Sequence, residues 1–227
     1  MLVLNANSRP VSSAQSTTHR HLHQQVARHT HSVFLKPIND VNKRAFDQSM
    51  AAWNQAGNAP LILDAGCGVG LSSRYLAQQT PSHFVIGVDQ SADRLGRGVE
   101  WPYAVPLNMV LIRADLVDYW RLLHQAGVAL ARHYVLYPNP WPKIGQLSRR
   151  WHGHAVFPTV AALGGEFECR SNWSIYIEEC AAALTQLTTL PVVAEPYITA
   201  APITPFEKKY QASGHALWRC RVRLERR

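Results

Sequence analysis

The sequence PLILDAGCGVG occupies residues 60–70, and LSSRYLA follows it at residues 71–77. A short apolar run, an acidic residue, a glycine-rich turn and then helix-forming residues predict a buried strand, a tight loop and the start of a helix. Gly66, Gly68 and Gly70 let the backbone turn sharply and let a ligand approach main-chain N–H groups without meeting a Cβ. We interpret this stretch as a loop that holds a nucleotide cofactor.

The spacing of the glycines narrows the choice of nucleotide. The third glycine comes one residue too early for the dinucleotide fingerprint Gly-x-Gly-x-x-Gly, and the phosphate-binding motif ending in Gly-Lys-Ser/Thr is absent. Asp64, Asp89 and Asp115 each stand at the carboxyl end of an apolar run. Three carboxylates around a glycine loop suit a cationic nucleoside without phosphates, although the glycine motif alone also fits a turn in another α/β protein.

Strand and helix patterns alternate along the rest of the chain. Expected strands follow the opening strand at residues 83–89, 108–115, 133–137 and 166–170, and expected helices cover residues 71–79, 116–125, 157–163 and 174–187. Short connections between them predict an α/β fold with parallel strands and right-handed crossovers. Two final strands, residues 192–198 and 215–224, are expected on either side of a proline-rich loop. The last one alternates Trp218, Cys220, Val222 and Leu224 with Arg219, Arg221 and Arg223.

The arrangement of glycines and acids resembles the S-adenosylmethionine site of Rossmann-like methyltransferases. That resemblance places Asp64 near the methionyl end of the cofactor, Asp89 on the ribose and Asp115 near the adenine. The two closing strands resemble the end of the seven-stranded sheet in class I methyltransferases. We therefore expect that sheet, with a C-terminal β-hairpin and an N-terminal helical extension.

Composition sets outer limits on the function. The 227 residues suit one methyltransferase domain at residues 58–227, preceded by a polar arm and helices at residues 1–57. A net charge of +8 favours a polyanionic partner. Four widely spaced cysteines predict free thiols in a reducing compartment, and no stretch suits a membrane span or a signal peptide. We expect a cytoplasmic protein, monomeric or homodimeric, that does not bind a membrane.

The N-terminal region carries no chemistry that we can assign. Its first 18 residues are small and polar, which predicts a mobile arm. His19 and His23 have the i, i+4 spacing of metal ligands, but no carboxylate or cysteine completes a set, so we expect no metal. Residues 40–56 predict an amphipathic helix that packs against the sheet.

The fourth strand runs into YPNPWPK at residues 137–143. Prolines fix the backbone on both sides of Asn139 and leave Trp141 displayed, so the turn can stack a planar base while an amide meets its edge. A rigid turn around a core tryptophan is the alternative. The basic residues Lys143, Arg149 and Arg150, followed by WHGH at residues 151–154, predict contact with a nucleic-acid backbone.

At this point the chain resembles the bacterial tRNA (guanine-N7)-methyltransferase family. That family carries Pro-Asp-Pro-Trp-x-Lys, a basic run ending in Lys-Arg-Arg, Gly-Gly before a strand, Thr-Asp-Trp-x-x-Tyr, Thr-x-Phe-Glu, and then Gly-His with an aromatic residue. The corresponding stretches here are PNPWPK at residues 138–143, SRR at 148–150, GG at 164–165, SNWSIY at 171–176, TPFE at 204–207, and GH at 214–215 with Trp218. The motifs run from residue 61 to the C-terminus in the same order.

The resemblance implies methyl transfer from S-adenosylmethionine to N7 of a variable-loop guanosine in tRNA. It places Asn139 at the cofactor and the reacting base as the candidate catalytic residue, and Arg149 and Arg150 on the RNA. Substrate contacts are implied for Lys143, Asn172, Thr204, Phe206 and Glu207. Asn139 and Asn172 replace family aspartates. This departure leaves open a related N-methyltransferase acting on another RNA position or a small heterocycle, or an RNA-binding protein without activity.

Overall fold

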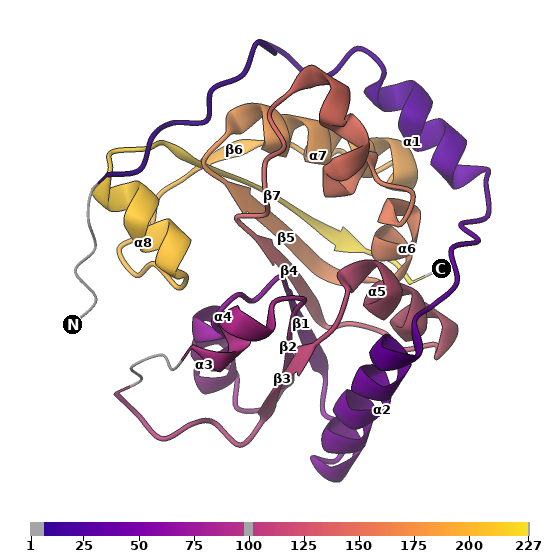
Figure 1. Ribbon diagram of the computed structural model, residues 1–227, viewed down its shortest axis with the longest axis vertical. Helices are drawn as coiled ribbons and strands as arrows, with labels where there is room; N and C mark the ends of the chain where they lie inside the picture. The colour runs from indigo at the N-terminus through magenta and orange to yellow at the C-terminus, as the bar shows by residue number, and fades with distance from the viewer. Residues whose placement is uncertain (1–6, 98–101, 227) are drawn as a thin grey trace.

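The computed structural model describes residues 7–97 and 102–226, and these form a seven-stranded sheet in the order β3-β2-β1-β4-β5-β7-β6 (Figure 1). The first five strands are parallel, and β7 runs antiparallel to both β5 and β6. The strands are β1 (Leu61–Ala65), β2 (Phe84–Asp89), β3 (Met109–Arg113), β4 (Arg132–Leu136), β5 (Gly165–Ser171), β6 (Glu195–Tyr197) and β7 (Leu217–Leu224). The expected class I methyltransferase sheet, with its closing hairpin, is confirmed.

Helices cover both faces of this sheet. They are α1 (Leu22–Thr30), α2 (Asp40–Gln55), α3 (Leu71–Gln79), α4 (Ala92–Gly96), α5 (Leu116–Gln125), α6 (Phe157–Ala162), α7 (Ser174–Thr188) and α8 (Pro205–Ala212), with 3-10 segments η1 (Ile144–Arg149) and η2 (Trp151–Gly153). In β1, Leu61 and Leu63 face the core that α2, α5, α6 and α7 cover, while Ile62 faces Leu76 of α3. All five residues of β1 are buried because both faces are covered.

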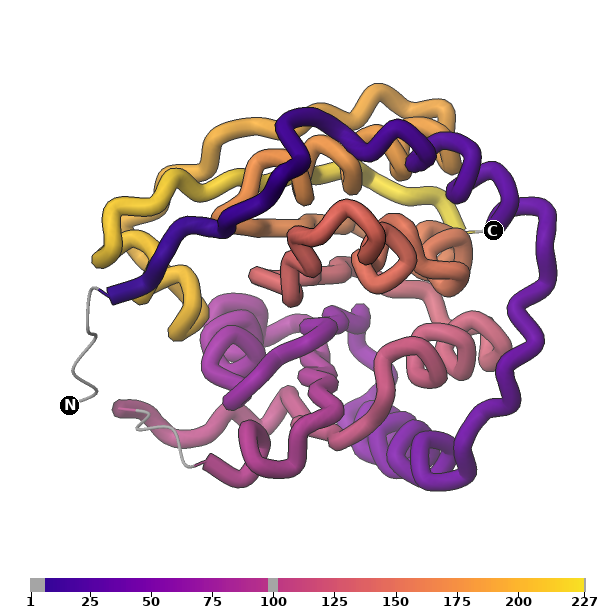
Figure 2. The backbone as a smooth tube through the Cα atoms, turned by 45° about the horizontal axis from the view of Figure 1, so that its top comes forward, coloured from indigo at the N-terminus to yellow at the C-terminus, as the bar shows by residue number. Residues whose placement is uncertain are grey.

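Residues 7–18 are hydrogen-bonded to the rest of the protein, so the expected mobile arm is wrong for them. Residues 1–6 lie outside the described part. The backbone N–H of Ser8 donates to Ser213 Oγ at 3.1 Å, and Ser13 Oγ donates to the carbonyl of Pro142 at 2.6 Å. Figures 1 and 2 show this segment running from α8 across the molecule to α1. Helix α1 then packs on α7, and α2 on β3 and α5.

The chain between the last two strands contains α8, where the sequence predicted only a proline-rich loop. Thr204 caps this helix because its Oγ1 accepts the N–H of Glu207 at 2.9 Å, and Pro205 occupies the first turn, where a proline needs no hydrogen-bond partner. The predicted alternation in the last strand is confirmed: Cys220 and Leu224 are buried, whereas Arg221 and Arg223 are exposed.

Because β1 to β5 are parallel, their carboxyl ends meet at one edge of the sheet. The glycine loop, Asp89, Asp115, Asn139 and Asn172 all follow those ends, so the fold gathers there the segments that carry the predicted chemistry. In the described ranges no helix is long and apolar enough to span a membrane, and no three His, Cys, Asp or Glu side chains group as metal ligands.

Candidate active site

The glycine loop is held against the second strand by main-chain hydrogen bonds. The N–H groups of Gly66 and Cys67 donate to the carbonyl of Val88 at 2.8 and 3.0 Å, and Gly68 N–H donates to Asp89 Oδ2 at 3.0 Å. Gly70 has a φ of +76°, and a Cβ there would lie 2.5 Å from a methyl group of Leu111. The loop therefore requires a glycine at its last position for both backbone conformation and space.

Asp64 lies beneath this loop and is almost fully buried. Its Oδ2 accepts the hydroxyls of Ser72 and Ser73 at 2.6 and 2.7 Å, and its Oδ1 has no hydrogen-bond partner. Burial raises the pKa of Asp64, and the two serine hydroxyls offset this only in part. An unpaired buried carboxylate oxygen beside an open glycine loop can accept a hydrogen bond from a cationic ligand.

Asp89 ends β2 and Asp115 follows β3, at the same edge of the sheet. Asp89 is 3% exposed, and its Oδ1 accepts the N–H of Ser91 at 2.8 Å. Each of its oxygens can still accept a second donor such as a ribose hydroxyl. Asp115 caps α5 by accepting Val117 N–H at 2.9 Å, and Lys36 Nζ lies 3.6 Å from its other oxygen.

The residues present therefore fit S-adenosylmethionine. A Cβ at Gly68 would meet no atom within 4 Å, so there is open space beside the loop, and the orphaned Asp64 oxygen and the Asp89 carboxylate are acceptors for an ammonium group and for hydroxyls. The structure brings the glycine loop into contact with Asp89, while Asp115 stands on the adjoining strand end.

The loop after β4 displays Asn139 between two residues with strained backbone. Tyr137 and Trp141 have φ values of +52° and +47°, which non-glycine residues adopt only when their surroundings impose it. Asn139 is exposed, and its Oδ1 accepts the N–H of Trp141 at 3.3 Å. Its Nδ2 has no partner among the described residues, so the amide can donate to a ligand.

A buried ion pair fixes this loop from below. Glu179 and Arg150 are both fully buried, and Arg150 Nη1 donates to Glu179 Oε2 at 2.6 Å. The same guanidinium donates to the carbonyls of Trp141 at 3.1 Å and Lys143 at 3.4 Å. Arg150 thus ties both sides of the Trp-Pro-Lys turn to α7, which explains how the strained backbone near Asn139 is maintained.

Glu179 receives four hydrogen bonds in all. Besides Arg150, His152 Nε2 donates at 2.7 Å, Gln15 Nε2 at 2.6 Å and the N–H of His19 at 2.8 Å. Burial acts to raise the pKa of Glu179, but the hydrogen bonds and charge of His152 and Arg150 outweigh it and lower the pKa to about 2. One carboxylate therefore joins the N-terminal segment, the Asn139 loop and α7.

The burial of Arg150 overturns its predicted contact with RNA, because a guanidinium without exposed surface cannot reach a phosphate. Arg149 and Lys143 remain exposed and stay candidates for that role. The guanidinium of Arg149 lies 4.8 Å from the ring centroid of Trp141, a cation–π contact that leaves its outer N–H groups free.

The predicted substrate contacts also divide into buried and exposed residues. Glu207 is fully buried, and its carboxylate accepts Tyr137 Oη at 2.8 Å, Arg170 Nη1 at 3.0 Å and Ile203 N–H at 2.7 Å. Thr204 is the buried cap of α8, so both residues support the Tyr137 turn and α8 and neither faces a substrate. These two predicted contacts are corrected to structural roles.

Phe206 and Asn172 remain near the candidate acceptor site. Phe206 is 46% exposed and stacks on Tyr210, which stacks in turn on His215. Asn172 Nδ2 pairs with His215 Nδ1 at 3.1 Å, and His215 Nε2 meets the carbonyl of Ser8 at 3.0 Å. The stack ends on an exposed aromatic face that can hold a base.

Sequence reasoning missed Glu179 and Gln15 as parts of this site, and it quoted His215 only within the Gly-His motif without giving it a role. Glu179 lies within a largely apolar helix, and a lone acid on the buried face of such a helix was the one available signal of a buried partner. No local pattern marks Gln15, because its partner is far away in the sequence.

Comparison with known proteins agrees with this geometry. Residues 58–220 match the model of the family described as "Putative methyltransferase". The tRNA (guanine-N(7)-)-methyltransferases of Treponema pallidum (strain Nichols) and of a Nocardioides species are each 30% identical to this chain, over 70% of its length. The matched region spans 65% and 66% of those two relatives.

The fold also matches a solved structure of an antibiotic-related methyltransferase, with a TM-score of 0.53 and 16% identity over 86% of this chain and 98% of that one. The family match covers well over half of the chain and confirms the resemblance drawn from the motifs. The chain therefore belongs to this family of S-adenosylmethionine-dependent methyltransferases and carries its class I fold.

Proposed function

We propose that this protein transfers the methyl group of S-adenosylmethionine to N7 of a guanine in tRNA, at a variable-loop guanosine. One observation carries the proposal: the exposed amide of Asn139 stands on a rigidly held turn at the same sheet edge as the glycine loop. The relatives named as tRNA (guanine-N(7)-)-methyltransferases, at 30% identity, support the choice of acceptor.

The donor end binds the cofactor through the glycine loop. The unpaired Oδ1 of Asp64 accepts from the methionyl ammonium, and Asp89 accepts from the ribose hydroxyls. Asp115 stands at the adenine side. The bound cofactor supplies a sulfonium that makes its methyl group electrophilic.

The acceptor end needs to position the base and exclude water. Guanine N7 attacks with its own lone pair and has no proton to lose, so no general base is required. Asn139 positions the base edge, Lys143 and Asn172 contact the nucleoside, and Phe206 offers a stacking face. An amide stabilises the ring that becomes cationic less than a carboxylate does, so we expect slower transfer than an aspartate at this position gives.

Glu207 does not make up for the missing carboxylate. Its charge is balanced by Arg170 and its side chain is fully buried, which leaves no negative charge free to face the ring. The free Nδ2 of Asn139 favours a second candidate, an N-methyltransferase in which that amide donates to an acceptor atom on a different base or heterocycle.

The test is to incubate the purified protein with labelled S-adenosylmethionine and unmodified tRNA, then to digest the tRNA and identify the methylated nucleoside. We expect 7-methylguanosine, and no incorporation into tRNA that already carries it. Label in another nucleoside would favour the second candidate. Failure to label any RNA, with tRNA binding intact, would favour an RNA-binding protein without activity.

A further inference from the structure

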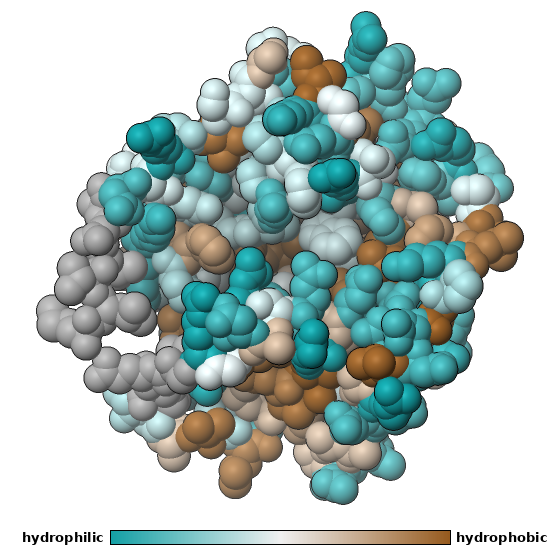
Figure 3. All heavy atoms as spheres, in the orientation of Figure 1, coloured by the Kyte–Doolittle hydropathy of each residue, from teal (hydrophilic) through white to brown (hydrophobic). Residues whose placement is uncertain are grey.

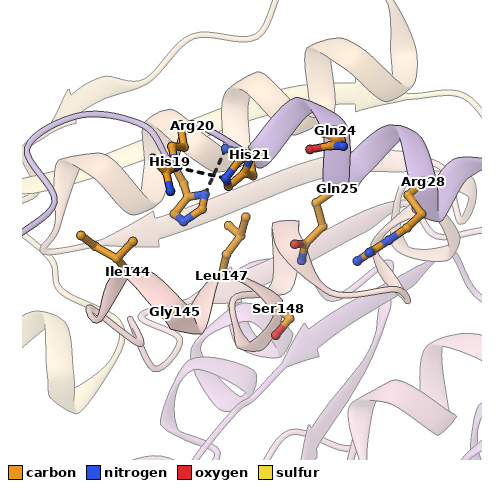
Figure 4. A pocket seen from close by; sticks show the side chains of 10 residues that line it. All are labelled: His19, Arg20, His21, Gln24, Gln25, Arg28, Ile144, Gly145, Leu147 and Ser148. Atoms are coloured by element: carbon orange, nitrogen blue, oxygen red, sulfur yellow. Dashed lines mark hydrogen bonds between the residues drawn. The ribbon is translucent and has the colours of Figure 1, made fainter.

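A groove separates α1 from η1, outside the site described above. Its volume is about 720 Å³. Figure 4 shows Gln25 and Arg28 entering from α1 on one side, and Leu147 and Ser148 from η1 on the other. This size is within the range of roughly 300–1,000 Å³ that bound ligands occupy.

The groove is basic and contains no acidic side chain among its lining residues. Arg20 and Arg28 are exposed, and neither has an ion-pair partner in the part of the chain that the structure describes. Arg20 lies in the turn just before α1 and Arg28 lies in the last turn of α1, so a largely helical rise separates them by roughly 12 Å. The surface over α1 is hydrophilic in Figure 3.

The carboxylate that joins the two walls of the groove is already neutralised. Glu179 is fully buried and paired with Arg150, and it holds both walls in place by accepting from His19 on the α1 side and from Arg150 on the loop side. A ligand in the groove therefore meets arginines, amides and a serine hydroxyl without facing a negative charge.

The groove adjoins the candidate active site. Segment η1 begins directly after Lys143, so the loop that displays Asn139 continues into the groove wall, and Arg149 stands at its far end. A polyanion whose reacting base lies at Asn139 has its neighbouring backbone next to this wall. Gln24 and Ser148 can donate to phosphate or ribose oxygens there.

We propose that the groove between α1 and η1 binds the phosphodiester backbone of the RNA substrate, beside the nucleotide that is methylated. The inference rests on the proposed function and assigns the N-terminal helix a part in substrate binding. Two exposed arginines roughly 12 Å apart can each contact a phosphate of the same strand, a few nucleotides apart, because the strand carries one charge per about 3.4 Å.

The test combines Arg20→Ala with Arg28→Ala and measures tRNA affinity across a series of salt concentrations. We expect affinity to fall roughly tenfold or more, and the slope of log affinity against log salt to fall by about two, because two phosphate contacts are lost. Affinity for S-adenosylmethionine should not change, since neither arginine touches the glycine loop.

The matched control is Arg44→Ala with Arg223→Ala, which removes the same charge from α2 and β7, where both side chains are exposed. This control should leave the salt slope within about one of the original. A second variant, Ser148→Glu, places a negative charge in the opposite wall and should weaken binding without removing an arginine.

The outcomes separate the two proposals. If the unmodified protein binds and methylates tRNA while the Arg20/Arg28 variant keeps its affinity and salt slope, the groove inference is wrong and the proposed function stands. If the unmodified protein neither binds nor methylates tRNA, the proposed function itself fails. Equal losses of tRNA affinity and salt slope in the groove variant and in the control would mean that total charge, and not this groove, governs binding.

Discussion

The two ends of the candidate site are built in different ways. The cofactor end consists of β1, the glycine loop and α3, together with the next strand, β2. Its hydrogen bonds lie within residues 64–73 and join them to residues 88 and 89. The acceptor end is assembled from residues spread over the whole chain, with Glu179 joined to both Gln15 and Arg150. Local hydrogen bonds shape the first end and a buried ion pair shapes the second.

This difference also appears in the acids at each end. Burial raises the pKa of Asp64, whose carboxylate has only two serine hydroxyls as partners. Glu179 is equally buried, yet the donors around it lower its pKa to about 2. The cofactor end thus keeps a poorly satisfied acid available for a ligand, whereas the acceptor end uses a fully satisfied acid to hold its loops.

The largest effect is expected from Glu179→Gln, which leaves Arg150 buried without a counter-charge. We expect the free energy of unfolding to fall by about 3 kcal/mol. The rate of single-turnover methylation should fall as well, because the carbonyls of Trp141 and Lys143 lose their anchor. Chemical denaturation and rapid-quench rates measure the two effects.

Asp118→Asn is the matched control for Glu179→Gln. Asp118 is also buried and accepts from Asn39 and Asn42, but it holds α2 and does not touch the Asn139 loop. At a temperature where both variants are folded, only Glu179→Gln should be slow. Equal rates would mean that Glu179 has no positioning role beyond stability.

Acid should weaken the Glu179–Arg150 ion pair of the acceptor end only below the ordinary carboxyl pKa of 4.5. The folded-state pKa of Glu179 lies below the ordinary value of 4.5, at about 2, so its contribution to stability is complete above pH 4.5 and is lost as the pH falls to 2. That contribution is about 3 kcal/mol. Denaturation between those pH values should show a smaller loss for Glu179→Gln than for the unmodified protein. Parallel curves of stability against pH for the two proteins would mean that Glu179 is not the source of the loss in acid.

Asn139→Asp tests whether the acceptor end works on guanine N7. A carboxylate beside a ring that becomes cationic stabilises the transition state, so turnover on tRNA should be maintained or rise. If Asn139 instead donates its amide N–H to a different acceptor, turnover should drop on the order of a hundredfold. Single-turnover rates on unmodified tRNA distinguish these outcomes, and the drop would favour the second candidate function.

Asp89→Ala tests the cofactor end. Loss of a carboxylate that accepts ribose hydroxyls should weaken S-adenosylmethionine binding by on the order of 1.5–3 kcal/mol, or roughly tenfold and more. Calorimetric titration measures the dissociation constant, and tRNA affinity should stay the same. An unchanged constant for the cofactor would remove Asp89 from the site.

The smallest effect is expected from Arg149→Ala. This residue is exposed, so the variant should fold normally and should lower the salt slope of tRNA binding by about one. Arg150→Ala, its neighbour, should instead lower stability because it leaves Glu179 unpaired. If Arg150→Ala changed the salt slope and left stability intact, the assignment of the two arginines would have to be reversed.

Much of the fold could be predicted from the sequence because its signals are local. Helix Leu116–Gln125 has the predicted bounds, since Asp115 caps it and its apolar face repeats at helical spacing. Helix α8 escaped prediction because the two prolines of its approach look like loop residues, although one of them occupies the first helical turn.

The sequence by itself determined the positions of the glycine loop, the strand-end acids and Asn139, since the glycines, the apolar runs that end in acids and the prolines around Asn139 are local signals. Only the tertiary structure decided that Arg149 faces solvent while Arg150 is buried. A charge enters a protein interior only where a partner compensates its lost hydration. For Arg150 that partner is Glu179, which the folding of α7 against the loop brings within 2.6 Å.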